Sequence, residues 1–146
     1  MEQKDCPFCE IAAGRIGASI ICSDAHVIAF ADHRPIRPGH VQIIPRVHYP
    51  LFDDVPADLA ARIVLLGQRI AKAQKRLYCV ERVGFVFTGN DVAHCHAHLI
   101  PLHEATDVTS ARYADGGVQP IDRAQMDQTA RRIGRALGGP GAETEG

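Results

Sequence analysis

The chain carries three histidines at alternate positions, His94, His96 and His98, within the sequence HCHAHLIP of residues 94–101. Successive side chains of an extended strand point to opposite faces, so we expect the three imidazoles on one face. The opposite face then receives only small or apolar side chains: Cys95, Ala97 and Leu99. Such a row predicts either a metal-binding site or a set of catalytic bases, because neutral imidazole serves in both roles.

The geometry of a strand distinguishes these two chemistries. Three ligands at consecutive same-face positions span roughly 13 Å at about 3.3 Å per residue. A zinc ion, with bonds of about 2.1 Å, can reach two of them easily and all three only with strain. A neutral imidazole is a competent nucleophile toward phosphorus when its other ring nitrogen donates to a backbone carbonyl, and neighbouring imidazoles can donate to phosphoryl oxygens. The row therefore favours nucleophilic catalysis.

A long amphipathic helix and several short strands are expected around these histidines. Apolar residues recur at steps of three and four over residues 59–77, which indicates one long helix, and Asp53, Asp54 and Pro56 are its start signals. A weaker helical pattern covers residues 122–137. Runs rich in β-branched and aromatic residues predict strands at 19–22, 26–31, 41–45, 83–87 and 93–100.

These elements predict an α+β fold: an antiparallel sheet of about five strands, one long helix and a C-terminal helix. The length of 146 residues suits a single domain, which we place at residues 1–137. Residues 138–146 contain no core-forming side chain and are expected to be a disordered tail.

Composition excludes several classes of partner. The formal net charge of −1 leaves no general basic surface for nucleic acid or an anionic membrane. No apolar run approaches the roughly 18 residues that span a bilayer, and the N-terminus has no signal-peptide core. We therefore expect a cytoplasmic protein without nucleic-acid or membrane partners. Its five cysteines would be reduced or metal-bound, since an odd count suits a disulfide framework badly.

Two separated blocks resemble one protein family. Residues 94–100 match the signature of the histidine triad (HIT) superfamily, His-φ-His-φ-His-φ-φ with φ apolar. Upstream, AFAD at 29–32 and RPGHVQIIPRVH at 37–48 resemble the family block F-x-D … GH … IP(K/R)xH. With the cysteine pair near the N-terminus, the similarity covers roughly residues 6–103. The chain is identified as a member of this superfamily, and a HIT-like fold is implied.

The resemblance implies an enzyme that releases a purine nucleoside monophosphate from a phosphoramidate or a dinucleotide-type substrate. His96 would attack the α-phosphorus and form a covalent nucleotidyl-histidine intermediate, which water then hydrolyses. His98 would contact the phosphate and the bridging atom, while His94 and His40 would support the row.

Substrate contacts are implied outside the row as well. Asp32 stands where family members bind the ribose hydroxyls, a task that suits a carboxylate because it accepts from both members of a vicinal diol; we include the adjacent His33. Many relatives carry Asn-x-Gly and then Gly-Gln before the triad, whereas this chain reads TGND at 88–91. Asn90 would replace the glutamine as a phosphate or leaving-group contact. Asp91 is expected to point away from the phosphate or to act in acid–base chemistry.

The N-terminal pair Cys6-x-x-Cys9 is compatible with a redox pair or a metal site, although no thioredoxin-type βαβ pattern surrounds it. A tetrahedral zinc needs two more ligands. The resemblance to bacterial relatives implies that His48 and His94 supply them, which gives a structural zinc bound by Cys6, Cys9, His48 and His94, and no organic cofactor. The alternative is that both cysteines remain small buried thiols.

Two other functions remain open at this stage. One is a nucleotidyl phosphorylase or transferase, in which phosphate or a sugar phosphate replaces water. The other is a nucleotide-binding regulatory module with weak or no catalysis. Family members of this size usually pair, so the resemblance also implies a homodimer.

Overall fold

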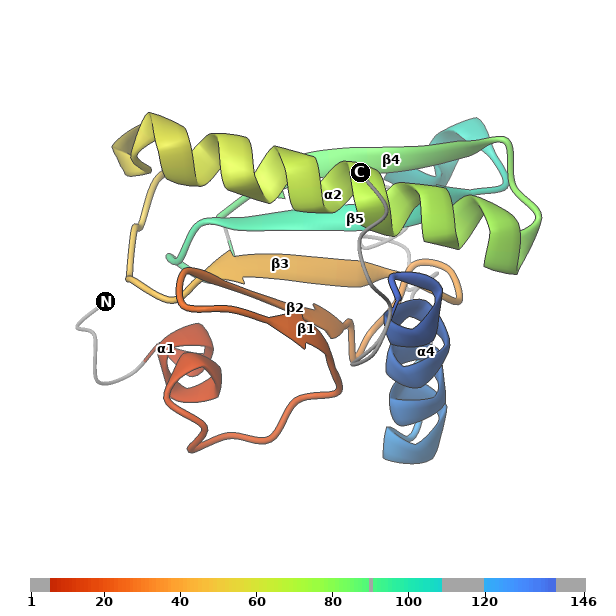
Figure 1. The fold of residues 1–146 in the computed structure, drawn as a ribbon, viewed down its shortest axis with the longest axis horizontal. Coiled ribbons are helices and arrows are strands. Elements are labelled where there is room, and N and C mark those ends of the chain that lie inside the picture. Colours follow the sequence, from red (N-terminus) through yellow and green to blue (C-terminus); the bar gives the residue numbers. More distant parts are fainter. Residues whose placement is uncertain (1–5, 90, 109–119, 139–146) are drawn as a thin grey trace.

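The computed structural model describes residues 6–89, 91–108 and 120–138 (Figure 1). Its centre is a sheet of five antiparallel strands in the spatial order β1-β2-β3-β5-β4. This sheet and its helices confirm the predicted α+β class. The strands are β1 (Ile20–Ser23), β2 (Val27–Ala31), β3 (Val41–Pro45), β4 (Arg82–Thr88) and β5 (His96–Leu102).

In the described part of the chain, three α-helices and two short 3-10 helices accompany the sheet. The long helix is α2 (Ala57–Tyr78), preceded by the 3-10 turn η2 (Phe52–Asp54). It follows Pro56, as the start signals predict, and ends where Cys79 takes a left-handed conformation with φ of 53°. The remaining helical segments are α1 (Pro7–Ala12), η3 (Ala105–Val108) and α4 (Arg123–Ala136). None of the helices in the described part of the chain is long and apolar enough to cross a membrane.

The alternation of side chains gives the sheet two different faces. On one face, Ala97 and Leu99 of β5 join a core with Ile63 and Ile70 of α2 and Ile133 of α4. On the other face, α1 contributes to a smaller apolar core, made of Cys6, Phe8, Ile28, Phe30 and Ile44. Figure 1 shows α1 well apart from α2. Because Ala97 and Leu99 face the large helices, His96 and His98 must face the other way.

The strand predicted at 93–100 is shifted, because β5 begins at His96 and continues to Leu102. Before it, the backbone bends: the His94 N–H donates to the Val92 carbonyl at 2.7 Å. The Cys95 N–H donates to the Tyr49 carbonyl at 2.6 Å, which ties this bend to the segment after β3. His94 therefore lies just outside the regular strand. Of the tail expected at 138–146, Gly138 is described, and its N–H donates to the Arg135 carbonyl at 3.0 Å; residues 139–146 fall outside the described residues.

Candidate functional site

His96 and His98 of the histidine row lie on β5, between β3 and β4, on the face of the sheet away from α2. In the antiparallel register, His98 is the Cα partner of Gln42 on β3, and His96 is the partner of Thr88 on β4. Both histidines are buried, at 1% exposure for His96 and 7% for His98. Strands on both sides therefore present side chains to the row.

His40 reaches the row from the loop between β2 and β3. Gly39, which precedes it, has φ of +90°, and a Cβ there would lie 2.3 Å from the Tyr78 ring. Only glycine permits both this conformation and this approach. The buried Gln74 side chain donates to the Gly39 carbonyl at 2.7 Å and to the Leu99 carbonyl at 3.0 Å, which fixes the loop against β5.

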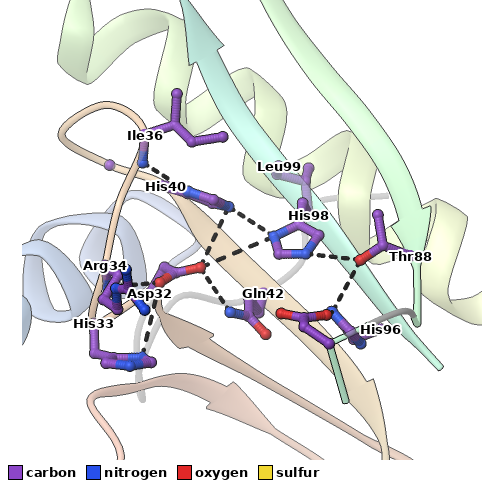
Figure 2. A network of polar contacts seen from close by, with 12 residues as sticks. Asp32, His33, Arg34, Ile36, His40, Gln42, Thr88, His96, His98 and Leu99 are labelled. Carbon is purple, nitrogen blue, oxygen red and sulfur yellow. Dashed lines mark hydrogen bonds and ion pairs between the residues drawn. The ribbon is translucent and has the colours of Figure 1, made fainter. Parts of the chain in front are cut away.

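The hydrogen-bond partner of His40 determines where its proton lies. The Ile36 backbone N–H can only donate, and it lies 3.1 Å from His40 Nδ1. His40 is therefore neutral and carries its proton on Nε2, which lies 2.8 Å from His98 Nδ1. His98 must accept there and carry its own proton on Nε2, which donates to Thr88 Oγ1 at 3.0 Å. Figure 2 shows this series of contacts.

The other end of the row gives a consistent assignment. The His94 backbone carbonyl can only accept, and His96 Nδ1 lies 2.7 Å from it. The proton of neutral His96 is therefore on Nδ1, and Nε2 holds a free electron pair. The Thr88 hydroxyl lies 2.9 Å from that Nε2 and donates to it, because it already accepts from His98. The result is one directed hydrogen-bond chain from Ile36 N–H to the His94 carbonyl.

Burial supports this neutral state. It lowers the pKa of His98 to about 4, with His40 and His96 adding to the effect. Burial also lowers the pKa of His40. Protonating either ring at neutral pH would place a charge in a site with little solvent. His40 and His98 are thus neutral bases.

Asp32, predicted to bind ribose, lies at the His40 end of this network with 4% exposure. Its Oδ1 accepts from Arg34 N–H at 2.7 Å, and its Oδ2 accepts from Gln42 Nε2 at 2.6 Å and lies 3.5 Å from His40 Nε2. Burial alone would raise the pKa of Asp32, but His40 and these hydrogen bonds lower it below its ordinary value. The carboxylate is ionised and accepts hydrogen bonds only.

Of the other predicted substrate contacts, those that the structure describes are more exposed than Asp32. His33 lies beside Asp32, with Nδ1 3.9 Å from Oδ1, but its side chain is 73% exposed. Asp91 is 77% exposed, and its Oδ1 lies 3.7 Å from His96 Nε2. Asn90 lies outside the described residues. Sequence reasoning missed Thr88, whose hydroxyl bridges the two histidines; its place at the end of the strand paired with the row was the available signal.

A group of possible metal ligands lies where α1 meets the start of the row. The four predicted ligands Cys6, Cys9, His48 and His94 bring one donor atom each, all within 4.8 Å of one another. Sulfur-to-Nδ1 distances are 3.4 Å for Cys6 to His94, 3.3 Å for Cys9 to His48 and 3.6 Å for Cys9 to His94. Tetrahedral zinc bonds of about 2.3 Å to sulfur and 2.1 Å to nitrogen separate such atoms by about 3.6 Å. The cluster has the donors and the spacing of a tetrahedral metal site.

His94 links the two clusters. Its Nε2 lies 2.9 Å from the Pro45 carbonyl and must donate to it, which leaves Nδ1 unprotonated and turned toward the two sulfurs. A ligating histidine normally donates its other nitrogen in this way. Phe8, on α1 between the two cysteines, packs edge-on against both His94 and His96, with ring centroids 5.8 and 4.9 Å away.

Comparison with known proteins agrees with this architecture. The HIT domain family matches residues 13–105. An uncharacterized HIT-like protein from Methanocaldococcus jannaschii is 33% identical over 103 residues, which cover 68% of this chain and 80% of the relative. A relative named adenosine 5′-monophosphoramidase, from Saccharomyces cerevisiae, is 32% identical over 100 residues, which cover 68% of this chain and 63% of the relative.

Among solved structures, a zinc-bound histidine triad family protein from Mycobacterium smegmatis matches with a TM-score of 0.73 and 24% identity. The match covers 92% of this chain and 94% of the other. At that identity, the similarity concerns the fold. Cys6 and Cys9 precede the segment that the family model matches.

Proposed function

Because this chain belongs to the HIT domain family, we propose that it cleaves a purine nucleoside monophosphate from a phosphoramidate or dinucleotide-type substrate through a covalent intermediate on His96. The observation that carries this proposal is the orientation of the His96 ring. Its Nδ1–H donates to the His94 carbonyl at 2.7 Å, so Nε2 is the free base and lies on the side of Thr88. The yeast relative is named adenosine 5′-monophosphoramidase, and that name supports a phosphoramidate substrate for this chain.

In the first step, His96 Nε2 forms a bond to the α-phosphorus as the bond from phosphorus to the leaving group breaks. A leaving amine takes its proton from solvent. The imidazole gains positive charge when Nε2 is bonded to phosphorus, and the carbonyl that accepts from Nδ1–H stabilises that charge. Water then attacks the phosphorus and loses a proton to solvent, the bond to Nε2 breaks, the imidazole is neutral again, and the nucleoside monophosphate leaves.

Thr88 and His98 would serve the phosphoryl group. The Thr88 hydroxyl donates to His96 Nε2, so it must turn away when phosphorus approaches that nitrogen. A phosphoryl oxygen is then the natural acceptor for it. His98 presents its Nε2–H on the same side, because His40 fixes the proton there. Donors held in place before reaction stabilise developing negative charge without reorganising.

Asp32 is the proposed ribose contact, since its carboxylate is ionised and lies beside the row. We propose His33 as a weaker contact at the exposed rim next to it. Asn90 stays a proposal from the sequence, as a phosphate or leaving-group contact.

We propose a structural zinc ion bound by Cys6, Cys9, His48 and His94. The support is the donor set and its spacing, together with the Pro45 carbonyl that orients His94. Zinc bound there would stabilise the thiolates and attach α1 to the sheet. The chemistry at phosphorus remains with His96 and its hydrogen-bond partners.

We also propose a homodimer. Apolar side chains are exposed on α2 and on the edge strand β4: Val64, Leu65 and Phe85. Burying these side chains against a second copy is favourable, and light scattering after gel filtration should give twice the mass of the chain. A Leu65→Glu variant that leaves the mass unchanged would place the interface elsewhere.

Incubation with adenosine 5′-phosphoramidate tests the function, with AMP and ADP separated by chromatography. A hydrolase releases AMP and ammonia in equal amounts, with or without added phosphate. Formation of ADP in the presence of phosphate would indicate a phosphorylase instead. Binding of AMP without any turnover would contradict the enzyme assignment and favour a regulatory module.

A further inference from the structure

Gln42 is a polar residue in a strand that is otherwise apolar. It lies in β3, whose five residues are all buried, and Gln42 itself is 6% exposed. Its neighbours Val41 and Ile43 point to the helix-covered core. The Cα of Gln42 pairs with that of His98, so its side chain lies on the face of the histidine row.

The orientation of the Gln42 amide follows from its partner. One end lies 2.6 Å from Asp32 Oδ2, and an ionised carboxylate can only accept, so that end is the nitrogen. The carbonyl oxygen therefore points the other way. Figure 2 shows the nitrogen toward Asp32 and the oxygen on the side of His96.

The Gln42 oxygen is buried and has no hydrogen-bond partner among the described residues. An unpaired buried acceptor is costly, and a leucine of similar size would avoid that cost. Figure 2 shows the Gln42 side chain between Asp32 on one side and His96 and His98 on the other. A ligand group that contacts this oxygen must be a hydrogen-bond donor to satisfy it.

We propose that Gln42 Oε1 accepts a hydrogen bond from one of the two ribose hydroxyls of the bound nucleoside monophosphate. This inference rests on the proposed function, which supplies the nucleotide. Asp32 and Gln42 then form a pair of acceptors held together by their own hydrogen bond. A vicinal diol carries two donors on adjacent carbons, which suits two adjacent acceptors. Gln42 is thereby a specificity residue that distinguishes ribose from the deoxyribose that lacks the contacted hydroxyl.

Two substitutions separate the acceptor of Gln42 from its donor. Gln42→Leu removes both. Gln42→Lys keeps a donor for Asp32 but offers no acceptor, and so tests whether an effect comes from the Gln42 oxygen or from a displaced carboxylate. Circular dichroism and thermal unfolding establish that each variant is folded.

Calorimetric dissociation constants for AMP, 2′-deoxy-AMP and 3′-deoxy-AMP give the test. In the wild type, removal of one of the two hydroxyls should weaken binding roughly tenfold or more, because a buried acceptor loses its donor. Both variants should bind AMP about tenfold more weakly and lose the penalty at that same hydroxyl. If the penalties persist in Gln42→Leu, or if Gln42→Lys retains them, the assignment to Gln42 Oε1 is wrong.

This outcome is independent of turnover. Wild-type protein that hydrolyses the phosphoramidate but shows no ribose preference overturns only the role of Gln42. Protein that neither binds AMP nor releases it from the phosphoramidate overturns the proposed function, and the role of Gln42 with it.

Discussion

Two clusters of buried or half-buried ionisable side chains lie along one row of histidines, and their interatomic distances separate metal chemistry from proton chemistry. The first is made of Cys6, Cys9, His48 and His94, and its three shortest sulfur-to-Nδ1 distances are between 3.3 and 3.6 Å. The second is made of Asp32, His40 and His98, whose side chains are also of types that bind metal ions. There, however, His40 Nε2 and His98 Nδ1 are 2.8 Å apart. Two imidazoles on one zinc would be about 3.4 Å apart. A proton, rather than a metal ion, joins them.

The two clusters share His94 but use different parts of it. Its side chain belongs to the metal-type cluster, and its backbone carbonyl accepts from His96 Nδ1–H. The division of the row therefore predicts separable defects. Changes in the first cluster should act mainly on stability, and changes in the second should act mainly on catalysis.

The largest effect is expected from His96→Ala. Loss of the nucleophile should reduce the release of AMP from adenosine 5′-phosphoramidate by at least about 10⁴-fold, or ~5 kcal/mol of barrier. Zinc content, measured by plasma mass spectrometry on untagged protein, should stay at that of the wild type. The exposed His26→Ala is the matched control and should keep full activity. Substantial AMP release by His96→Ala would exclude this residue as the nucleophile.

The second largest effect is expected from the double variant Cys6→Ser, Cys9→Ser. Untagged wild-type protein should contain about one zinc per chain, and the variant should contain none. Loss of the ion should lower the free energy of unfolding by roughly 4 kcal/mol, measured by urea denaturation, because binding to the folded state contributes to folding.

The exposed Cys79 lies outside the cluster, and Cys79→Ser should retain the metal. The catalytic rate should fall much less in the cysteine variant than in His96→Ala, since Phe8 and the His94 carbonyl lose support but the reactive ring remains. A full metal content in the double variant would refute the proposed ligands.

The sequence predicted the first cluster more completely than the second. Period-two and period-3.6 patterns located five strands and two helices, and the family resemblance supplied all four residues of the first cluster. The start of β5 could not be predicted, because it depends on the Cys95 N–H bonding to the distant Tyr49 carbonyl. The helix at residues 57–78 was easier to predict, since all residues of its buried face belong to one continuous segment.

The roles of Thr88 and Gln42 required the register of the sheet. Thr88 ends a strand as an ordinary turn residue, and only its pairing with His96 brings its hydroxyl between two imidazoles. Gln42 is recognisable in the sequence as one polar residue among apolar neighbours. Its contact with Asp32 could not be predicted, because it depends on how the loop that carries His40 folds between β2 and β3. Contacts between neighbouring strands were thus the part of the site that local patterns do not encode.

The third prediction concerns pH and the neutral state of the second cluster. His98 has a folded-state pKa of about 4, below the 6.5 of a free imidazole, so the unfolded chain binds more protons between these values. Stability must then fall as pH decreases from about 6.5 toward 4. Between pH 7 and pH 5, the contribution of His98 should be a loss of about 2 kcal/mol.

Urea denaturation at pH 7 and pH 5, with constant zinc, can measure this loss as the difference between the wild type and His98→Asn. The variant should lose less stability on acidification. The exposed His33→Asn should follow the wild type, because its ring lies mostly in solvent. Equal losses in the wild type and His98→Asn would show that His98 is not held neutral by the fold.

The smallest effect is expected from Thr88→Val, which keeps the shape of the side chain and removes the hydroxyl. His98 Nε2–H then loses its acceptor, and the phosphoryl group loses one donor beside His96. We expect a decrease in kcat of roughly tenfold, or ~1.4 kcal/mol, with unchanged zinc content. Thr88→Ser restores a hydroxyl at the same position and should recover most of the rate. If valine and serine behave alike, the hydroxyl has no part in turnover, and the hydrogen-bond chain only fixes the resting orientation of the rings.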